Sequence, residues 1–420
     1  MNPDFLYAIR TCPALDPAVR DDFPMTGIQS HGKPFAYLNN AATTLKPLPV
    51  LEAMDRYYRE YGSPIHRGAD RIAHKATTAF ESVRRTVARF LGTPHPEAVV
   101  FTGGTTAGLN LVCLSYGELV VGAGDEVVVT PNEHHANYVP WQQLCRRKNA
   151  KLVLAPLDAN GCLQPEALES VMTERTRIVA CSHITNVMGA AMDLRALAAV
   201  VHRHGAVIVV DGAQGVVHER PDVVGWDIDF YAFSGHKLYG PTGVGVLYGR
   251  PALLEKMPPV VMGGEMIDIV DVYETSFREP PWRFEAGTLP VAEVIGLGAA
   301  IDYVLELGYC GMQKKVLGLT ERAVRGLSGL ENVHVYNPEN AFSGVLSFNI
   351  RGVHPHDASS VYDREGIALR AGHHCSQPTM RWLGVGATLR ASFAIYNDDS
   401  EVDRLIEASK KAGDFLDVLF

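Results

Sequence analysis

The sequence predicts an α/β fold in which a mostly parallel, doubly wound sheet of roughly seven strands is followed by a smaller α+β domain. Between Val50 and Gly249, short apolar runs alternate with segments of helical periodicity. This alternation is typical of parallel strands joined by helices on both faces of one sheet. Polar residues directly follow several of the apolar runs, and the carboxyl ends of strands are where open α/β sheets bind ligands.

The individual elements follow from the period of the apolar residues. Strands are expected at Val99–Phe101, Glu126–Thr130, Lys151–Leu157, Arg177–Cys181, Ala206–Val210, Phe230–Phe233 and Gly243–Leu247. Helices are expected at Val50–Tyr61, Thr77–Leu91, Thr106–Ser115 and Leu194–His204. The smaller domain is expected to contain helices at Val291–Leu307, Lys314–Leu327 and Glu401–Leu416 and strands at Val345–Ile350 and Thr388–Tyr396.

The segment Pro251–Pro290 is irregular and rich in Gly, Met and Pro, which suggests a loop region that packs across a neighbour. We therefore expect a large domain over residues 31–290. Residues 1–30 are expected to join 291–420 in the small domain, leaving a ligand cleft between the two.

Composition narrows the class of protein. The chain has 420 residues, a net charge of −9 and a pI near 6.0, which argues against nucleic acid or an anionic membrane as partner. No apolar run is long enough for a membrane span or preceded by a secretory basic region, so a cytoplasmic protein is expected. The seven cysteines are scattered, odd in number and without CxxC spacing, and are expected to be reduced thiols: Cys12, Cys113, Cys145, Cys162, Cys181, Cys310 and Cys375.

Asp211 and Lys237 indicate the chemistry. Asp211 follows the apolar run Ala206–Val210, and Lys237 lies in the glycine-rich loop after Phe230–Phe233. Pyridoxal phosphate needs both groups, because an amine forms its Schiff base and a carboxylate keeps its ring nitrogen protonated. Taken singly, the lysine could be a solvated surface residue and the aspartate a turn residue, so the prediction depends on further groups converging.

Several other segments could supply those groups. Thr102–Asn110 is a glycine-rich turn that opens a helix, an arrangement suited to a phosphate or to a simple capped turn. His134 follows a strand and could stack on a planar ring and, as a catalytic residue, shuttle protons near neutrality. Gln214 could donate to a ring oxygen. Arg390 lies inside an apolar strand, where a guanidinium usually binds a carboxylate.

The loop Arg370–Pro378 contains Cys375 next to two histidines and bounded by Gly and Pro. Neighbouring donors and an accessible loop are the conditions of a nucleophilic cysteine. A metal site is the alternative, but adjacent His-His-Cys residues cannot easily surround one tetrahedral ion and no second ligand pair has zinc spacing, so no metal is expected.

These segments together closely resemble the SufS-type (group II) cysteine desulfurases and the related selenocysteine lyases, within the class V branch of fold-type I pyridoxal phosphate enzymes. The matching segments extend in order over about residues 30–400. They are Tyr37–Thr44, His66–Gly68, Gly104–Thr106, Glu133–Asn137 with Pro140–Gln142, Asp211–Gln214, Ser234–Gly243, Trp282–Thr288 and Arg370–Cys375.

The resemblance implies a role for each matching residue. Lys237 would carry pyridoxal phosphate, Asp211 would pair with the ring nitrogen, Gln214 would face the ring oxygen and His134 would stack on the ring. Thr105, Thr106, Ser234 and His236 would hold the phosphate, together with Thr288 from the second subunit of a homodimer. Asn186 and Arg390 would bind the substrate carboxylate, Ala42 and Arg370 would also contact the substrate, and Cys375 would accept the sulfur.

The implied reaction converts L-cysteine to L-alanine and leaves a persulfide on Cys375 for an acceptor protein of SufE or SufU type, serving iron–sulfur cluster assembly. A selenocysteine lyase or specialised C–S lyase on the same fold, and a non-catalytic scaffold, are the alternatives. Four residues depart from the family pattern: Asn39, Asp70, Gly103 and Ala107. Because of these departures, the preference for L-cysteine or L-selenocysteine and the identity of the acceptor protein stay open.

Overall fold

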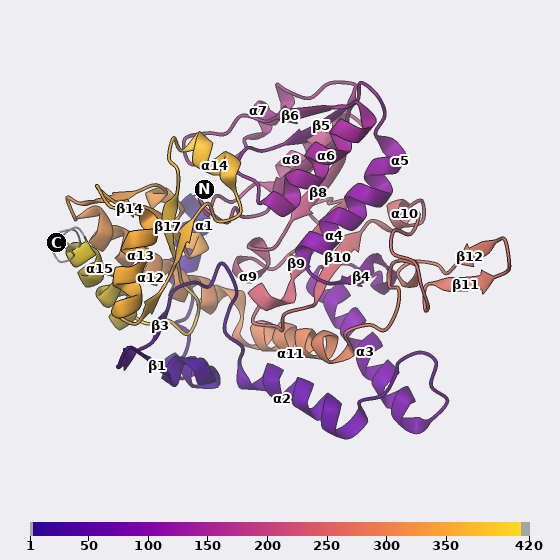
Figure 1. Ribbon diagram of the computed structural model, residues 1–420, viewed down its shortest axis with the longest axis horizontal. Helices are drawn as coiled ribbons and strands as arrows, with labels where there is room; N and C mark the ends of the chain where they lie inside the picture. The colour runs from indigo at the N-terminus through magenta and orange to yellow at the C-terminus, as the bar shows by residue number, and fades with distance from the viewer. Residues whose placement is uncertain (1–2, 413–420) are drawn as a thin grey trace.

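The computed structural model describes residues 3–412 and contains a seven-stranded sheet and a separate four-stranded sheet (Figure 1). The strand order of the large sheet is β4-β10-β9-β8-β7-β5-β6. Its strands are β4 (Val99–Thr102), β5 (Glu126–Val129), β6 (Lys151–Leu154), β7 (Thr176–Ser182), β8 (Val207–Asp211), β9 (Phe230–Ser234) and β10 (Gly245–Gly249). Only β10 runs antiparallel to its neighbours, so the expected mostly parallel sheet is confirmed.

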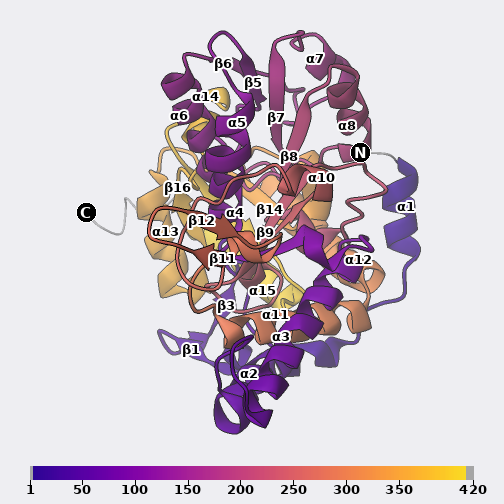
Figure 2. The ribbon, with the colours of Figure 1, turned by 90° about the vertical axis from the view of Figure 1, so that its right-hand side faces the viewer.

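Alternate residues of these strands enter two different cores. Val128, Val179 and Ile208 pack with α8 (Leu194–Arg203) and α11 (Val291–Leu307). Val127, Ile178 and Val209 pack with α4 (Thr105–Val112) and α6 (Val139–Lys148). Because successive strand residues point to opposite faces, both faces are covered, as Figure 2 shows for α6 and α8.

The remaining helices of this part are α2 (Leu48–Arg56), α3 (Arg71–Phe90), α5 (Glu118–Val120), α7 (Pro165–Glu169), α9 (Gly215–His218) and α10 (Pro251–Leu254). The expected helix at Thr77–Leu91 begins six residues earlier, at Arg71. Asp70 caps it, because its Oδ1 accepts from the backbone N–H groups of Ile72 and Ala73 at 2.9 and 3.0 Å. This departure from the family pattern thus has a local structural role.

The C-terminal sheet is antiparallel in the order β13-β14-β17-β16. Its strands are β13 (Val333–Val335), β14 (Val345–Ile350), β16 (Arg370–Gly372) and β17 (Thr388–Ser392), accompanied by α12 (Tyr309–Ser328), α13 (Pro355–Arg364), α14 (Gln377–Trp382) and α15 (Asp399–Ala412). The end of the helix expected at Glu401–Leu416 lies outside the described residues. The sequence missed β13 and β16, which have only three residues each.

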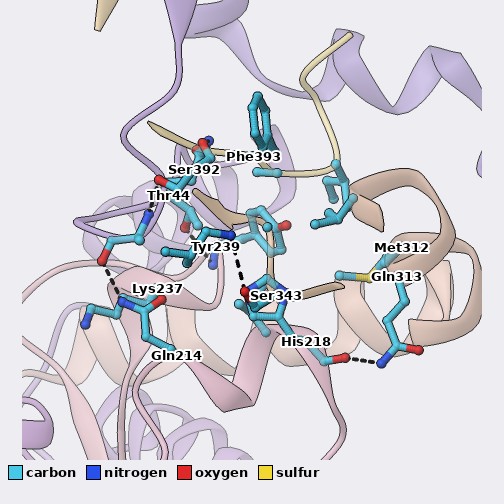
Figure 3. Close-up of a pocket in the computed structure, with 18 residues that line it drawn as sticks. Thr44, Gln214, His218, Lys237, Tyr239, Met312, Gln313, Ser343, Ser392 and Phe393 are labelled. Carbon is cyan, nitrogen blue, oxygen red and sulfur yellow. Dashed lines mark hydrogen bonds between the residues drawn. The ribbon is translucent and has the colours of Figure 1, made fainter. Parts of the chain in front are cut away.

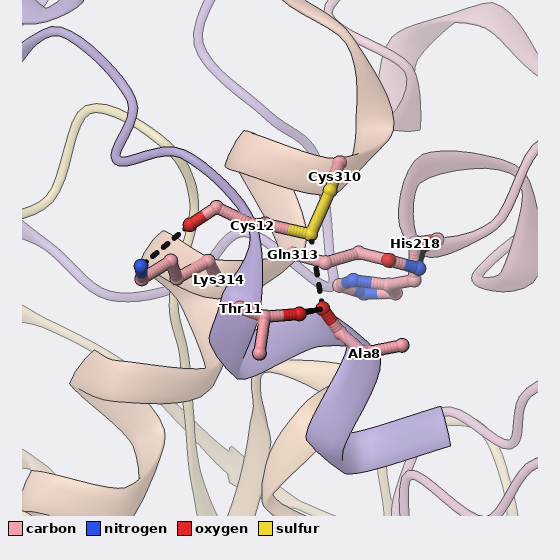
Figure 4. Close-up of a disulfide and its surroundings, with 7 residues drawn as sticks. All are labelled: Ala8, Thr11, Cys12, His218, Cys310, Gln313 and Lys314. Atoms are coloured by element: carbon pink, nitrogen blue, oxygen red, sulfur yellow. Dashed lines mark hydrogen bonds between the residues drawn. A yellow bond between two sulfur atoms is a disulfide. The ribbon is translucent and has the colours of Figure 1, made fainter. Parts of the chain in front are cut away.

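The N-terminal segment contacts this C-terminal part. Its elements are α1 (Pro3–Thr11), β1 (Gln29–Ser30), β2 (Lys33–Pro34) and β3 (Ala36–Tyr37), and β3 pairs with β15 (Ile367–Ala368). Cys12 and Cys310 form a disulfide at the first turn of α12 (Figure 4). The expectation of seven reduced thiols was therefore wrong for this pair; 298 residues separate the two cysteines, and only the tertiary fold brings them together.

The region expected to be irregular, Pro251–Pro290, contains a two-stranded hairpin of β11 (Ile267–Val270) and β12 (Thr275–Phe277). The hairpin projects from the body of the molecule (Figure 1). Its connecting residues Val272 and Tyr273 are 80% and 96% exposed. Within residues 3–412, no helix is long and apolar enough to cross a membrane.

Candidate active site

A cavity of about 170 Å³ lies at the carboxyl ends of the central strands. Twelve of the residues expected at the site line it: Ala42, Thr105, Thr106, His134, Asn186, Asp211, Gln214, Ser234, His236, Lys237, Arg370 and Arg390. These residues come from segments that are far apart in the sequence, and the sheet topology brings them to one place.

Asp211 and Lys237 are delivered by neighbouring strands. Asp211 is the last residue of β8, and Lys237 ends the short turn that follows β9. Burial lowers the pKa of Lys237 to about 8, although Asp211 acts in the opposite direction. Burial likewise raises the pKa of Asp211, against the effect of Lys237. One wall of the cavity therefore offers a reactive amine and a carboxylate that gains from a cationic partner.

Hydroxyl groups gather at the start of α4. Thr105 Oγ1 and Ser234 Oγ lie 2.7 Å apart, and the backbone N–H of Thr105 donates to Ser234 Oγ at 2.8 Å. Gly104 has φ +131°, and a Cβ there would lie 3.2 Å from Ser234 Oγ. The buried His236 Nδ1 has no protein partner. Hydroxyls, an orphaned imidazole nitrogen and a helix N-terminus fit the phosphate of pyridoxal phosphate.

His134 lies at the same cavity with a defined tautomer. Its Nδ1 accepts from the backbone N–H of Ala136 at 3.1 Å. Burial, followed by the charge of Lys237, lowers the pKa of His134 to about 3. The ring is therefore neutral near pH 7, with its proton on Nε2, and suits stacking on a planar cofactor. Gln214 lines the same cavity and donates to the Ala41 carbonyl at 2.7 Å.

Arg390 has the features of a carboxylate receptor. It lies fully buried in β17, and its Nη1 donates to the Asn186 carbonyl at 2.8 Å. Its Nε and Nη2, together with Asn186 Oδ1, have no protein partner. Burial lowers the pKa of Arg390 to about 9, helped by the nearby charge of Arg370. A bound carboxylate would satisfy the open nitrogens and offset the cost of burying this charge.

Cys375 lies on a tight loop next to these groups. His374 and Cys375 have φ of 52° and 56°, the left-handed region that is uncommon for non-glycine residues. Arg370 Nη2 donates to Cys375 Sγ at 3.2 Å, and the Cys375 carbonyl accepts from the backbone N–H of His135 at 2.7 Å. The thiol is partly exposed and beside a guanidinium, which suits a nucleophile.

Thr288 is not brought to this cavity. It lines a separate pocket together with His66 and Glu265.

Sequence reasoning also missed the buried Glu133, which accepts from Thr130 Oγ1 at 2.7 Å and from Ser182 Oγ at 2.7 Å. Its adjacency to His134 was the available signal, but hydrogen bonding across strands is not visible in a sequence.

A second, inner cavity of about 20 Å³ lies behind Lys237 (Figure 3). Lys237 and Gln214 line one side of it, and Met312 and Gln313 of α12 line another. This volume is enough for about one water molecule. Lys237 therefore lies in the wall between the inner cavity and the larger one.

The comparisons with known proteins agree with this geometry. The family model described as aminotransferase class-V matches residues 36–405. The chain belongs to this family. The family expected from the sequence is thereby confirmed.

A probable cysteine desulfurase from Halalkalibacterium halodurans is 46% identical over 398 residues, covering 95% of this chain and 98% of the relative. Two solved structures are similar over nearly the whole chain. A cysteine desulfurase from Escherichia coli in an S-sulfonic acid form has a TM-score of 0.89 at 39% identity and covers 97% of this chain and 100% of that one. The apo cysteine desulfurase from Thermococcus onnurineus has a TM-score of 0.90 at 38% identity, with 95% and 98% covered.

Proposed function

We propose that this protein is a pyridoxal phosphate-dependent cysteine desulfurase, which converts L-cysteine to L-alanine and transfers the sulfur to Cys375. The observation that carries the proposal is one cavity in which Lys237 and Asp211 face a buried arginine with open donors, with Cys375 on an adjoining loop. The relatives support the enzyme class, and the cofactor is that of class V aminotransferases.

The residues present fit the cofactor. The unpartnered His236 nitrogen and the hydroxyls of Thr105 and Ser234 match its phosphate. Asp211 matches its ring nitrogen, and Lys237 matches its aldehyde. When bound, pyridoxal phosphate accepts electrons released at the substrate's α-carbon. Lys237 moves the α-proton, because a pKa of about 8 leaves part of the amine neutral near pH 7. Arg390 holds the substrate carboxylate and so orients the bonds to be broken.

Cys375 completes the reaction at the sulfur atom. Its thiolate attacks the substrate sulfur, so that an S–S bond forms while the substrate's C–S bond breaks. The electron pair of that bond stays with the three-carbon product, which takes up protons to become alanine. Arg370 donates to the Cys375 sulfur and so holds it in a fixed place during attack.

The partners are inferred from what the single chain lacks. Thr288 is remote from the phosphate-binding hydroxyls, and the apolar connection of the β11–β12 hairpin is exposed. A second copy of the chain that buries this hairpin and supplies Thr288 would account for both observations. The persulfide would pass to an acceptor protein, and iron–sulfur cluster assembly is the use we propose for the sulfur.

The test is a product assay with the purified chain, pyridoxal phosphate, L-cysteine and a thiol reductant. Alanine and sulfide are expected in equal amounts. Lys237→Ala should form neither product, because it removes the only amine described at the cavity. Selenide release from L-selenocysteine without sulfide release from L-cysteine would favour the selenocysteine lyase alternative.

A further inference from the structure

The carbonyl of His236, in the peptide that joins His236 to Lys237, receives an unusual number of donors. The backbone N–H of Thr44 donates to it at 3.0 Å, and the hydroxyls of Thr43 and Thr44 each donate at 3.1 Å. The ammonium of Lys46 donates at 3.0 Å. A carbonyl has two lone pairs, so four donors around one oxygen leave this peptide little rotational freedom.

The Lys46 ammonium is directed at neutral oxygens. It also donates to the Thr44 carbonyl and, at 3.4 Å, to Thr43 Oγ1. None of the ion pairs found among residues 3–412 includes it, and burial lowers its pKa to about 8. An ammonium removed from water without a carboxylate is costly. Lys46 therefore does not serve to pair with an acidic side chain, and its contact with the His236 carbonyl suggests another role.

The same segment also fixes the chain beyond Lys237. Tyr239 has φ +60°, and its backbone N–H donates to Thr44 Oγ1 at 2.9 Å. Thr44, Lys237 and Tyr239 lie together along the inner cavity (Figure 3). Residues 43–46 thus hold the backbone on both sides of Lys237, and Lys46 supplies the charged contact of this clamp.

We propose that Lys46 is a positioning residue for Lys237, which holds the His236–Lys237 peptide so that the Lys237 amine is presented to the cofactor aldehyde. The inference rests on the proposed function in that pyridoxal phosphate attaches at Lys237. A displacement of the amine by a fraction of an ångström would slow attachment, since such reactions depend steeply on geometry.

Lys46 also acts on the imidazole of His236. Burial, the charge of Lys237 and then that of Lys46 lower the pKa of His236 to about 4. A neutral His236 donates one hydrogen bond to a phosphate without protonating it. Removing the Lys46 charge should raise the pKa of His236, an effect that a purely structural contact would not produce.

The experiment uses the apoenzyme of the full chain and needs no cysteine. The rate at which the visible absorbance of attached cofactor appears is measured for the wild type, Lys46→Met and Lys46→Arg. The phosphorus NMR resonance of the bound cofactor is then followed against pH. Lys33→Met is the matched control, because Lys33 pairs with Glu365 and is absent from both cavities.

Lys46→Met should attach the cofactor about tenfold more slowly, and its phosphorus resonance should titrate at higher pH. Lys46→Arg should restore both properties, and Lys33→Met should match the wild type. If Lys46→Met does not fold, Thr43→Val removes one donor to the same carbonyl, and about threefold slower attachment is expected.

The inference would be overturned if Lys46→Met attached the cofactor at the wild-type rate and its phosphorus titration were unchanged. If Lys46→Met does not fold, attachment at the wild-type rate in Thr43→Val would overturn it. So would a defect that arginine does not restore. Alanine formation by the wild type is measured in parallel. Its absence would refute the desulfurase activity, while the attachment rates would still decide the role of Lys46.

Discussion

Lys237 depends for its reactivity on two opposing influences at the scale of single residues. Burial favours the neutral amine, whereas the carboxylate of Asp211 favours the ammonium. The balance leaves the pKa of Lys237 at about 8, so roughly a tenth of the amine is neutral at pH 7. The amine can thus react with an aldehyde near neutrality while it still carries a proton for part of the time.

Asp211→Asn should shift the pH dependence of cofactor attachment. Because the Asp211 carboxylate raises the pKa of Lys237, its neutral replacement should lower that pKa. The midpoint of the attachment rate in the apoenzyme, near pH 8 in the wild type, should move to lower pH. Asp158→Asn, in a turn outside the cavity, is the control. An unmoved midpoint would show that Asp211 does not act on this amine.

The strands that carry the site were well predicted from the sequence at the scale of secondary structure elements, because β5, β8 and β9 are almost wholly buried and appear as continuous apolar runs. The residues that end them followed from the same pattern. Short elements such as β13 and β16 carry too few residues for a period to show. The Cys12–Cys310 pair depends on the packing of α1 against α12, which no local pattern indicates.

The Cys12–Cys310 disulfide, which joins the end of α1 to α12, can be tested by counting free thiols. Protein denatured without reductant should titrate five thiols, since Cys113, Cys145, Cys162, Cys181 and Cys375 are free and the remaining two are paired. Reduction should raise the count to seven. Cys310→Ala should lower the free energy of unfolding by about 2–4 kcal/mol, because the open chain gains entropy when unfolded. Seven thiols before reduction would contradict the pairing.

The whole molecule brings segments from both ends of the chain to one cavity. Ala42 lies in the N-terminal part, Asp211 and Lys237 in the central sheet, and Arg390 in the C-terminal sheet. Residue types and their positions after strands pointed to this set, and the resemblance to a family assigned the roles. Neither could supply the clamp of residues 43–46 on the His236 carbonyl, because hydrogen bonds between residues about two hundred positions apart exist only in the folded chain.

The central claim is that sulfur from cysteine passes to Cys375, and mass spectrometry of the cysteine-treated holoenzyme tests it most directly. After digestion without reductant, the peptide containing Cys375 should carry one additional sulfur atom, formed together with alanine. Cys375→Ser should show no adduct and should release sulfide at less than about a hundredth of the wild-type rate, since the nucleophile is gone. An adduct on another cysteine, or sulfide release by Cys375→Ser at the wild-type rate, would contradict the account.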